Sequence, residues 1–140
     1  MTMKSLILAV TAAFSISLLS FASPAKAFSG GTFPSCDAPQ VINYIQKRFV
    51  WTDTHVIKRG LAIDSITHTQ RNRVSYGNEY WSIPRLYCHG TAHMNDGKER
   101  RIWWLIEGGM GFAGLRDNLE FCISGLDPFK VHGAWCRSVR

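Results

Sequence analysis

The sequence predicts an α+β fold in which one N-terminal helix packs on an antiparallel sheet of four to five strands. Three observations favour this fold. A four-residue apolar period occurs once, within residues 38–50, a two-residue period recurs in the segments after it, and four cysteines can form two disulfides. The length of 140 residues allows one domain, and a hydrophobic content of 46% excludes intrinsic disorder.

The expected helix has one apolar stripe. Val41, Ile45 and Phe49 recur every four residues, which is the spacing of one helix face. We expect Asp37 to cap the first turn, with Gln40 three residues later as in a capping box. The helix therefore buries one side against the sheet.

The segments after the helix alternate between apolar and polar residues, which is typical of strands. Asp96 and Gly97 favour a two-residue hairpin turn between two of these segments, and this turn would place His89 opposite Trp104. The polar residues 70–78 are expected to form a loop or an exposed strand end. We expect strands at residues 61–69, 86–94, 99–106, 119–123 and 131–139.

The N-terminus has the pattern of a secretory signal peptide. Lys4 precedes an uncharged segment whose centre, residues 6–21, is largely apolar, and Ala25-Lys26-Ala27 has the small-x-small form of a cleavage site. The alternative is a retained membrane anchor, but a span needs about 20 apolar residues. We therefore predict cleavage after Ala27.

Cleavage of residues 1–27 changes the chemistry of the chain. It leaves 113 residues and lowers the net charge from +6 to +4, because Lys4 and Lys26 are lost. We predict an irregular leader at residues 28–35 and a single domain at residues 36–140, with no transmembrane span after cleavage. The expected compartment is the periplasm, and full secretion is the alternative.

Cysteine usage indicates an oxidising compartment. Cys36, Cys88, Cys122 and Cys136 are even in number, so two disulfides are expected in an exported chain. A zinc site is the rival interpretation, but the sequence has no C-x-x-C pair and no histidine at finger-like spacing. Four cysteines allow three pairings, and the sequence alone does not choose among them. We favour Cys122–Cys136, which closes a short loop, and therefore Cys36–Cys88.

Two motifs in the sequence have the spacing of cofactor or metal sites. Residues 109–114 match G-x-G-x-x-G, but a dinucleotide site needs a following helix, and the 26 residues that remain have a period of two. We therefore expect a loop between strands. His89 and His93 are four residues apart on an expected strand, a separation of about 13 Å that is too long for one metal ion. No metal or cofactor is predicted.

The main functional hypothesis is a non-enzymatic protein that binds an envelope protein or an anionic polymer through a sheet face and a basic hairpin tip. Neighbouring residues on a strand point to opposite faces, so one tryptophan of a Trp-Trp pair lies on the second face. Export argues against nucleic acid as the partner. The expected contact residues are Arg100, Arg101, Trp103, Trp104 and His93.

Two alternatives remain open. The first is a small enzyme or ligand-binding domain with a cleft between helix and sheet, in which Asp53, His55 or His89 would titrate. No recognised catalytic signature occurs, so no catalytic residue is assigned. The second alternative is a structural accessory subunit of an envelope complex, of unknown oligomeric state.

Several short motifs of the second half resemble a family of short exported bacterial proteins of unknown function. The resemblance covers residues 36–140 and implies a periplasmic location and a two-disulfide framework, with no catalytic residues to assign. The order of helix and strands is also similar to cystatin-like or nuclear transport factor 2-like architecture, an analogy of fold alone. The motifs are Arg85-Leu86-Tyr87-Cys88, Trp103-Trp104-Leu105-Ile106-Glu107, Gly111-Phe112, Gly125-Leu126-Asp127 and Cys136-Arg137.

Overall fold

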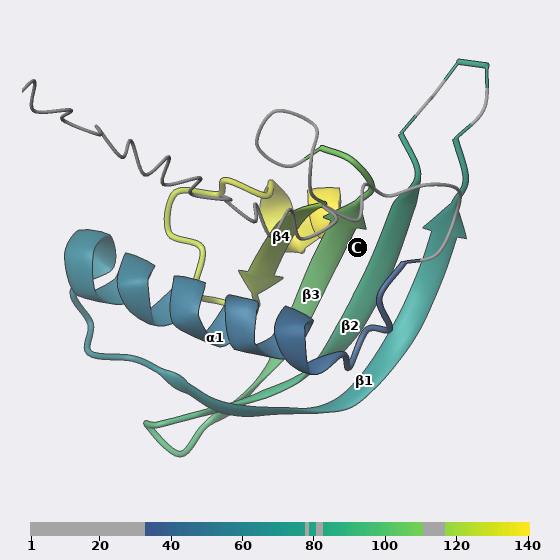
Figure 1. Ribbon diagram of the computed structural model, residues 1–140. Coiled ribbons are helices and arrows are strands. Elements are labelled where there is room, and N and C mark those ends of the chain that lie inside the picture. Colours follow the sequence, from purple (N-terminus) through teal and green to yellow (C-terminus); the bar gives the residue numbers. More distant parts are fainter. Residues whose placement is uncertain (1–32, 78, 81–82, 111–116) are drawn as a thin grey trace, which may run out of the picture.

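A computed structural model describes residues 33–77, 79–80, 83–110 and 117–140 (Figure 1). The predicted signal peptide and most of the predicted leader lie outside these residues. The predicted α+β fold is confirmed, because one long helix packs on a four-stranded antiparallel sheet with the strand order β1-β2-β3-β4. Its elements are α1 (Pro39–Thr52), η1 (Asp53–Ile57), β1 (Ile63–Ser75), β2 (Arg85–Met94), β3 (Glu99–Glu107), β4 (Asn118–Ile123) and η3 (Ala134–Val139).

Helix α1 lies across one face of the curved sheet, which we call the inner face (Figure 1). The apolar stripe is confirmed, because Val41, Ile45 and Phe49 are the buried residues of the helix. The predicted cap is wrong. Ala38 occupies the N-cap position without a side-chain hydrogen bond, and Pro39 begins the helix, where its missing N–H costs nothing.

Strand β1 is longer than predicted. It continues through residues 70–75, which form the exposed strand end that was one of the two expectations for this segment. These residues pair with β2, and their polar side chains face water, whereas Val74 packs against the apolar core. The register shifts at three points along the β1–β2 pair, so β1 is an irregular edge strand. No helix in the described part of the chain is long and apolar enough to cross a membrane.

The β2–β3 hairpin has a different register from the predicted one. His89 pairs with Trp103 rather than with Trp104, because the connection has three residues, 95–97, instead of two. Gly97 ends this loop with φ 72°, the left-handed conformation that closes a three-residue hairpin. Because residues that lie opposite each other share a face of the sheet, this shift of one position exchanges the faces of the β3 side chains relative to β2. Trp103, and not Trp104, therefore lies on the same face as His89.

The core has two parts, one on each face of the sheet. The larger part fills the space between α1 and the inner face and includes Ile45, Ile102, Trp104 and Ile106. The smaller part lies on the opposite face, which we call the outer face. Its members are Tyr87, Leu105, Cys122, Cys136 and Val139, with Trp103 packed against them.

The predicted last strand, residues 131–139, is wrong. The segment forms turns and then the short helix η3, in which Trp135 and Cys136 have positive φ values of 59° and 57°. A disulfide from Cys136 to Cys122 draws this segment over the outer face, so it covers the sheet instead of extending it.

Both favoured disulfide pairings are confirmed. Cys36–Cys88 joins the start of α1 to the inner face of β2, with 5.8 Å between the Cα atoms. Cys122–Cys136 joins β4 to η3 on the outer face, with 5.6 Å between the Cα atoms. The two disulfides therefore fasten one element to each face of the same sheet.

Candidate functional site

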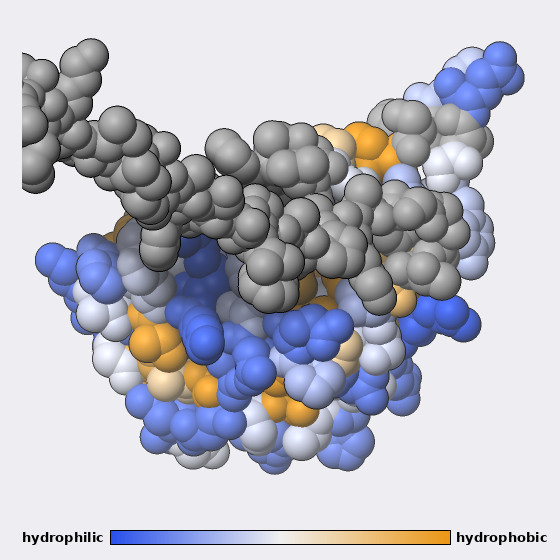
Figure 2. All heavy atoms as spheres, in the orientation of Figure 1, coloured by the Kyte–Doolittle hydropathy of each residue, from blue (hydrophilic) through white to orange (hydrophobic). Residues whose placement is uncertain are grey.

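A groove of about 510 Å³ lies where α1, β4 and the segment after β4 meet. Every residue of β4 contributes to its wall, together with residues from the second half of α1 and from the 126–132 segment. On the face that Figure 2 shows, apolar residues lie in separate patches between hydrophilic ones. The volume is in the range of ligand pockets in proteins.

Strand β4 is the last strand of the sheet, so one of its edges faces away from β3. The Ser124 N–H donates to the Arg101 carbonyl at 2.9 Å, which fixes the phase of the ladder. Alternate residues of β4 therefore bond to β3, while Leu119, Phe121 and Ile123 direct their N–H and C=O groups to the open edge. The Ile123 carbonyl accepts the Leu126 N–H at 3.0 Å.

The backbone groups of Leu119 and Phe121 at this edge have no hydrogen-bond partner within the described residues. Exposed strand edges of this kind are templates for pairing with another chain. Exposed apolar side chains stand on both sides of the edge: Tyr44 on α1, and Phe129 and Val131 on the segment that follows β4. The groove thus combines free backbone groups with apolar walls.

One end of the groove is closed by Asp53, whose side chain is only 2% exposed. Its carboxylate accepts the backbone N–H groups of Arg59 and Leu61, each at 3.0 Å, and the Arg59 Nε–H at 3.2 Å. Burial raises the pKa of Asp53, but these hydrogen bonds outweigh it, so the net pKa is lowered. Asp53 therefore fastens the loop after η1.

The three groups that we suspected for a catalytic cleft do not meet. Asp53 lines the groove, but His55 uses its Nδ1 on the Trp51 carbonyl at 2.8 Å and stacks on the Trp51 ring. His89 lies on the outer face of β2, opposite Trp103. In the described part of the chain, no group of three His, Cys, Asp or Glu side chains is arranged to hold a metal ion.

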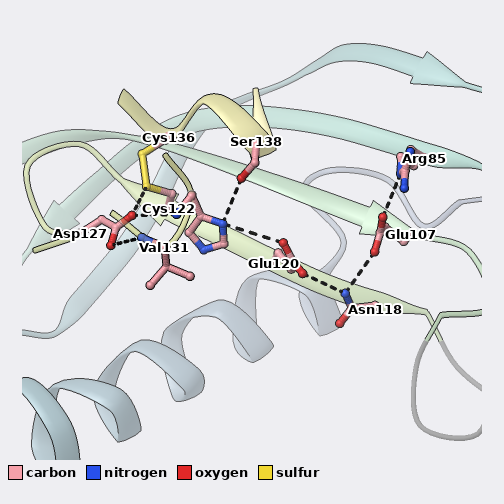
Figure 3. Close-up of polar contacts among 10 residues, drawn as sticks. Arg85, Glu107, Asn118, Glu120, Cys122, Asp127, Val131, Cys136 and Ser138 are labelled. Atoms are coloured by element: carbon pink, nitrogen blue, oxygen red, sulfur yellow. Dashed lines mark hydrogen bonds and ion pairs between the residues drawn. A yellow bond between two sulfur atoms is a disulfide. The ribbon is translucent and has the colours of Figure 1, made fainter. Parts of the chain in front are cut away.

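A row of polar side chains crosses the outer face next to the groove (Figure 3). The Arg85 Nε–H donates to Glu107 at 2.8 Å, which raises the pKa of Arg85. Asn118 donates to Glu107 at 3.3 Å and to Glu120 at 3.4 Å. These residues share the outer face because they alternate with the buried residues of their strands, a signal that the sequence contains.

His132 continues this row from the segment after β4. Its Nδ1 lies 3.8 Å from the Glu120 carboxylate and 3.3 Å from the Ser138 hydroxyl. Because both partners share one ring nitrogen, the three residues do not form a nucleophile–base–acid relay. Asp127 holds the segment by accepting the N–H groups of Val131 and His132, each at 3.0 Å. Sequence reasoning missed this row, since His132 reaches it only through the turn that Asp127 holds.

The predicted basic hairpin tip is partly neutralised. Both terminal nitrogens of the Arg100 guanidinium, Nη1 and Nη2, donate to the Asp96 carboxylate, at 3.1 and 2.9 Å, which lowers the pKa of Asp96 to about 2. Arg101 is exposed. The structure thus leaves Arg101, but not Arg100, as a cation of the tip without an ion pair among the described residues.

The prediction that Trp104 belongs to the contact surface is wrong. Its side chain is fully buried in the inner core, so it is inaccessible to a partner. Trp103 lies on the outer face, as the alternation of a strand requires, and packs against the outer cluster with the Arg140 guanidinium 5.6 Å from its ring. His93 is half-buried on the outer face, where its Nε2 forms a hydrogen bond with the Thr67 hydroxyl and its Nδ1 lies at ion-pair distance, 3.3 Å, from Glu99. The contact set is therefore split between two faces.

The glycine-rich motif at residues 109–114, predicted as a loop, extends into residues 111–116, which lie outside the described residues. Comparisons with protein-family models, with curated proteins and with solved structures found no match. The resemblance to a family of exported bacterial proteins therefore stays a prediction.

Proposed function

We propose that this protein is an exported binding module that holds an extended peptide segment of an envelope protein against the open edge of β4. One observation carries the proposal: the unpaired backbone groups of Leu119 and Phe121 line a groove of about 510 Å³. The class of function is the one that we expected from the sequence, the binding of an envelope partner. The proposed surface moves from the hairpin tip to the groove.

A peptide strand suits this groove better than a compact ligand. Paired with β4, it would satisfy the free N–H and C=O groups along an edge of six residues, which extends about 20 Å. Its side chains would point alternately to the two faces, and the exposed Tyr44 and Phe129 are available to contact them. Backbone pairing would provide affinity, and these side chains would provide selectivity.

The compartment supports the same proposal. Two disulfides are compatible with a periplasmic or extracellular protein, in which thiols are oxidised. Both fasten elements next to the groove: α1 through Cys36 and β4 through Cys122. A groove fixed in this way loses little conformational entropy on binding.

The experiment is a selection of dodecamers from a random displayed peptide library on the disulfide-intact protein. The selected peptide is then synthesised, and its Kd is measured by fluorescence anisotropy. Leu119→Pro removes the N–H that faces the groove without removing a bond to β3, and Leu119→Ala is the matched control that keeps this N–H.

We expect the proline variant to bind the peptide about tenfold or more weakly than wild type, and the alanine variant to bind nearly as wild type. One neutral hydrogen bond contributes about 1 kcal/mol, and its loss also leaves a carbonyl of the peptide unpaired. Circular dichroism checks that both variants are folded. Equal binding by the proline variant and wild type would show that β4 does not pair with the peptide. Selection of no peptide at all would also contradict the proposal.

A further inference from the structure

Four side chains on the outer face form one continuous row of polar contacts away from the groove, made of two hydrogen bonds at Thr67 and one ion-pair contact between His93 and Glu99. The Thr67 hydroxyl oxygen lies 2.7 Å from His93 Nε2, and His93 Nδ1 lies 3.3 Å from a carboxylate oxygen of Glu99. His68 Nδ1 lies 3.1 Å from the same hydroxyl oxygen. A hydroxyl, an imidazole and a carboxylate thus follow one another on three neighbouring strands, β1, β2 and β3.

The charge of Glu99 favours one direction for the hydrogen bonds of this row. The Glu99 carboxylate lies at ion-pair distance from Nδ1, so its charge favours the tautomer of His93 that carries the proton on Nδ1 and leaves Nε2 as an acceptor. Thr67 then donates its hydroxyl proton to Nε2. Because that proton is engaged, His68 donates its Nδ1–H to the Thr67 oxygen. The hydroxyl proton therefore points at a base that is itself oriented by a carboxylate, which is the arrangement of an activated nucleophile.

A distortion of β1 brings the fourth member into the chain. The β1–β2 register shifts here, so that His68 and Thr69 together lie opposite Gly90, and His68 has φ 50°. On a regular strand the side chains of Thr67 and His68 would point to opposite faces. The bulge allows them to touch, and strained backbone of this kind is common at functional sites.

We propose that Thr67 is a nucleophile activated by His93 and Glu99, and that this site transfers acyl groups from activated esters. The Thr67 oxygen attacks the ester carbonyl while its proton moves to His93 Nε2. The bond from the carbonyl carbon to the leaving alcohol breaks, and the alcohol takes that proton. Water then attacks the acyl-Thr67 and gives a proton to Nε2, and the Thr67 oxygen leaves and recovers it.

The position of the site limits its substrates. Thr67 and His93 are half-buried, Glu99 is exposed, and none of the three lines the groove. On this open surface, water meets the negative charge that develops on the carbonyl oxygen, in place of a pre-organised set of donors. The site therefore suits esters with good leaving groups and does not suit amides.

The experiment treats the disulfide-intact protein with p-nitrophenyl acetate. Release of p-nitrophenolate is followed by absorbance, and acetylated residues are mapped by mass spectrometry. Thr91 is the matched control within the protein, because it is a half-buried threonine of the neighbouring strand that pairs with Thr67. The variants are Thr67→Val, Thr67→Ser, His93→Gln and Glu99→Gln, and urea unfolding checks that each is folded.

We expect Thr67 to react about a hundredfold faster than Thr91, since a positioned base accelerates proton transfer by about 10²–10⁴-fold. His93→Gln should remove most of this difference, Glu99→Gln should remove part of it, and Thr67→Ser should retain it. If the acetyl group is hydrolysed quickly, Thr67→Val should abolish the catalysed release of p-nitrophenolate. Equal reactivity of the two threonines without catalysed release, or reactivity of Thr67 that is unchanged in His93→Gln, would overturn the proposal.

Discussion

Replacement of Trp104 tests how the inner core is held together. Its side chain is among the largest that are fully buried, and its indole Nε1–H has no hydrogen-bond partner within the described residues. The ring therefore contributes burial, whereas its N–H imposes a desolvation cost of about 1–3 kcal/mol. Trp104→Ala removes both and leaves a cavity, which typically costs about 3–5 kcal/mol.

Trp104→Phe separates the two effects. It keeps an aromatic ring in the core and removes the unpaired N–H, so we expect the free energy of unfolding to fall by no more than about 1 kcal/mol. Urea unfolding of the oxidised protein, followed by circular dichroism, measures both variants. Trp135→Phe is the control, because Trp135 is 80% exposed and should change stability by less than about 0.5 kcal/mol. If Trp104→Phe costs as much as Trp104→Ala, the N–H is not a burden and the reasoning is refuted.

Three further predictions concern the framework. The folded-state pKa of Asp53 is lowered, so its contribution to stability is present above the unfolded-state pKa of about 3.9 and is lost as the pH falls through the folded-state pKa. Thermal melts from pH 7 to pH 2 should show this loss of stability in wild type and a smaller loss in Asp53→Asn. Replacing both Cys122 and Cys136 by serine should cost about 3 kcal/mol in urea unfolding and make η3 sensitive to limited proteolysis, whereas an unchanged midpoint would contradict this. Gly90→Ala should destabilise by about 1–3 kcal/mol, because its Cβ would lie 3.0 Å from the Thr67 carbonyl oxygen; a neutral effect on the unfolding midpoint would show that β1 yields there.

The sequence was sufficient where local pattern decides structure. The helix follows from the spacing of Val41, Ile45 and Phe49. The short separation between Cys122 and Cys136 favoured one of three possible disulfide pairings, and that pairing is the one observed. The hairpin register was missed because Asp-Gly fits loops of two or three residues. Here Asn95 bonds to Ala62 and Gly60, contacts about 35 residues away along the chain that no local pattern shows.

The candidate site was harder to predict than the fold. The feature of the site that matters most is the open edge of β4, which depends on the strand order. The walls of the groove come from α1 and from the 126–132 segment. That segment was predicted in part as a strand, since Val131 and Val139 suggest one. Its actual path depends on the Asp127 side chain and on the disulfide at Cys136, which are tertiary contacts.

The two proposed sites lie at different places on the sheet, and this difference in position separates the two proposals. The groove lies between elements that the disulfides fix, so a peptide meets a surface that is already arranged, and reduction of Cys122–Cys136 should weaken peptide binding by freeing the outer-face end of that framework. The Thr67–His93–Glu99 chain lies at the hairpin end of its strands, whereas η3 packs on the outer face farther from the hairpin, against Tyr87 and Leu105. Its reactivity should therefore be the same after that disulfide is lost. A loss of both activities together would indicate that the sheet has unfolded, whereas loss of peptide binding alone would show that the two sites are independent.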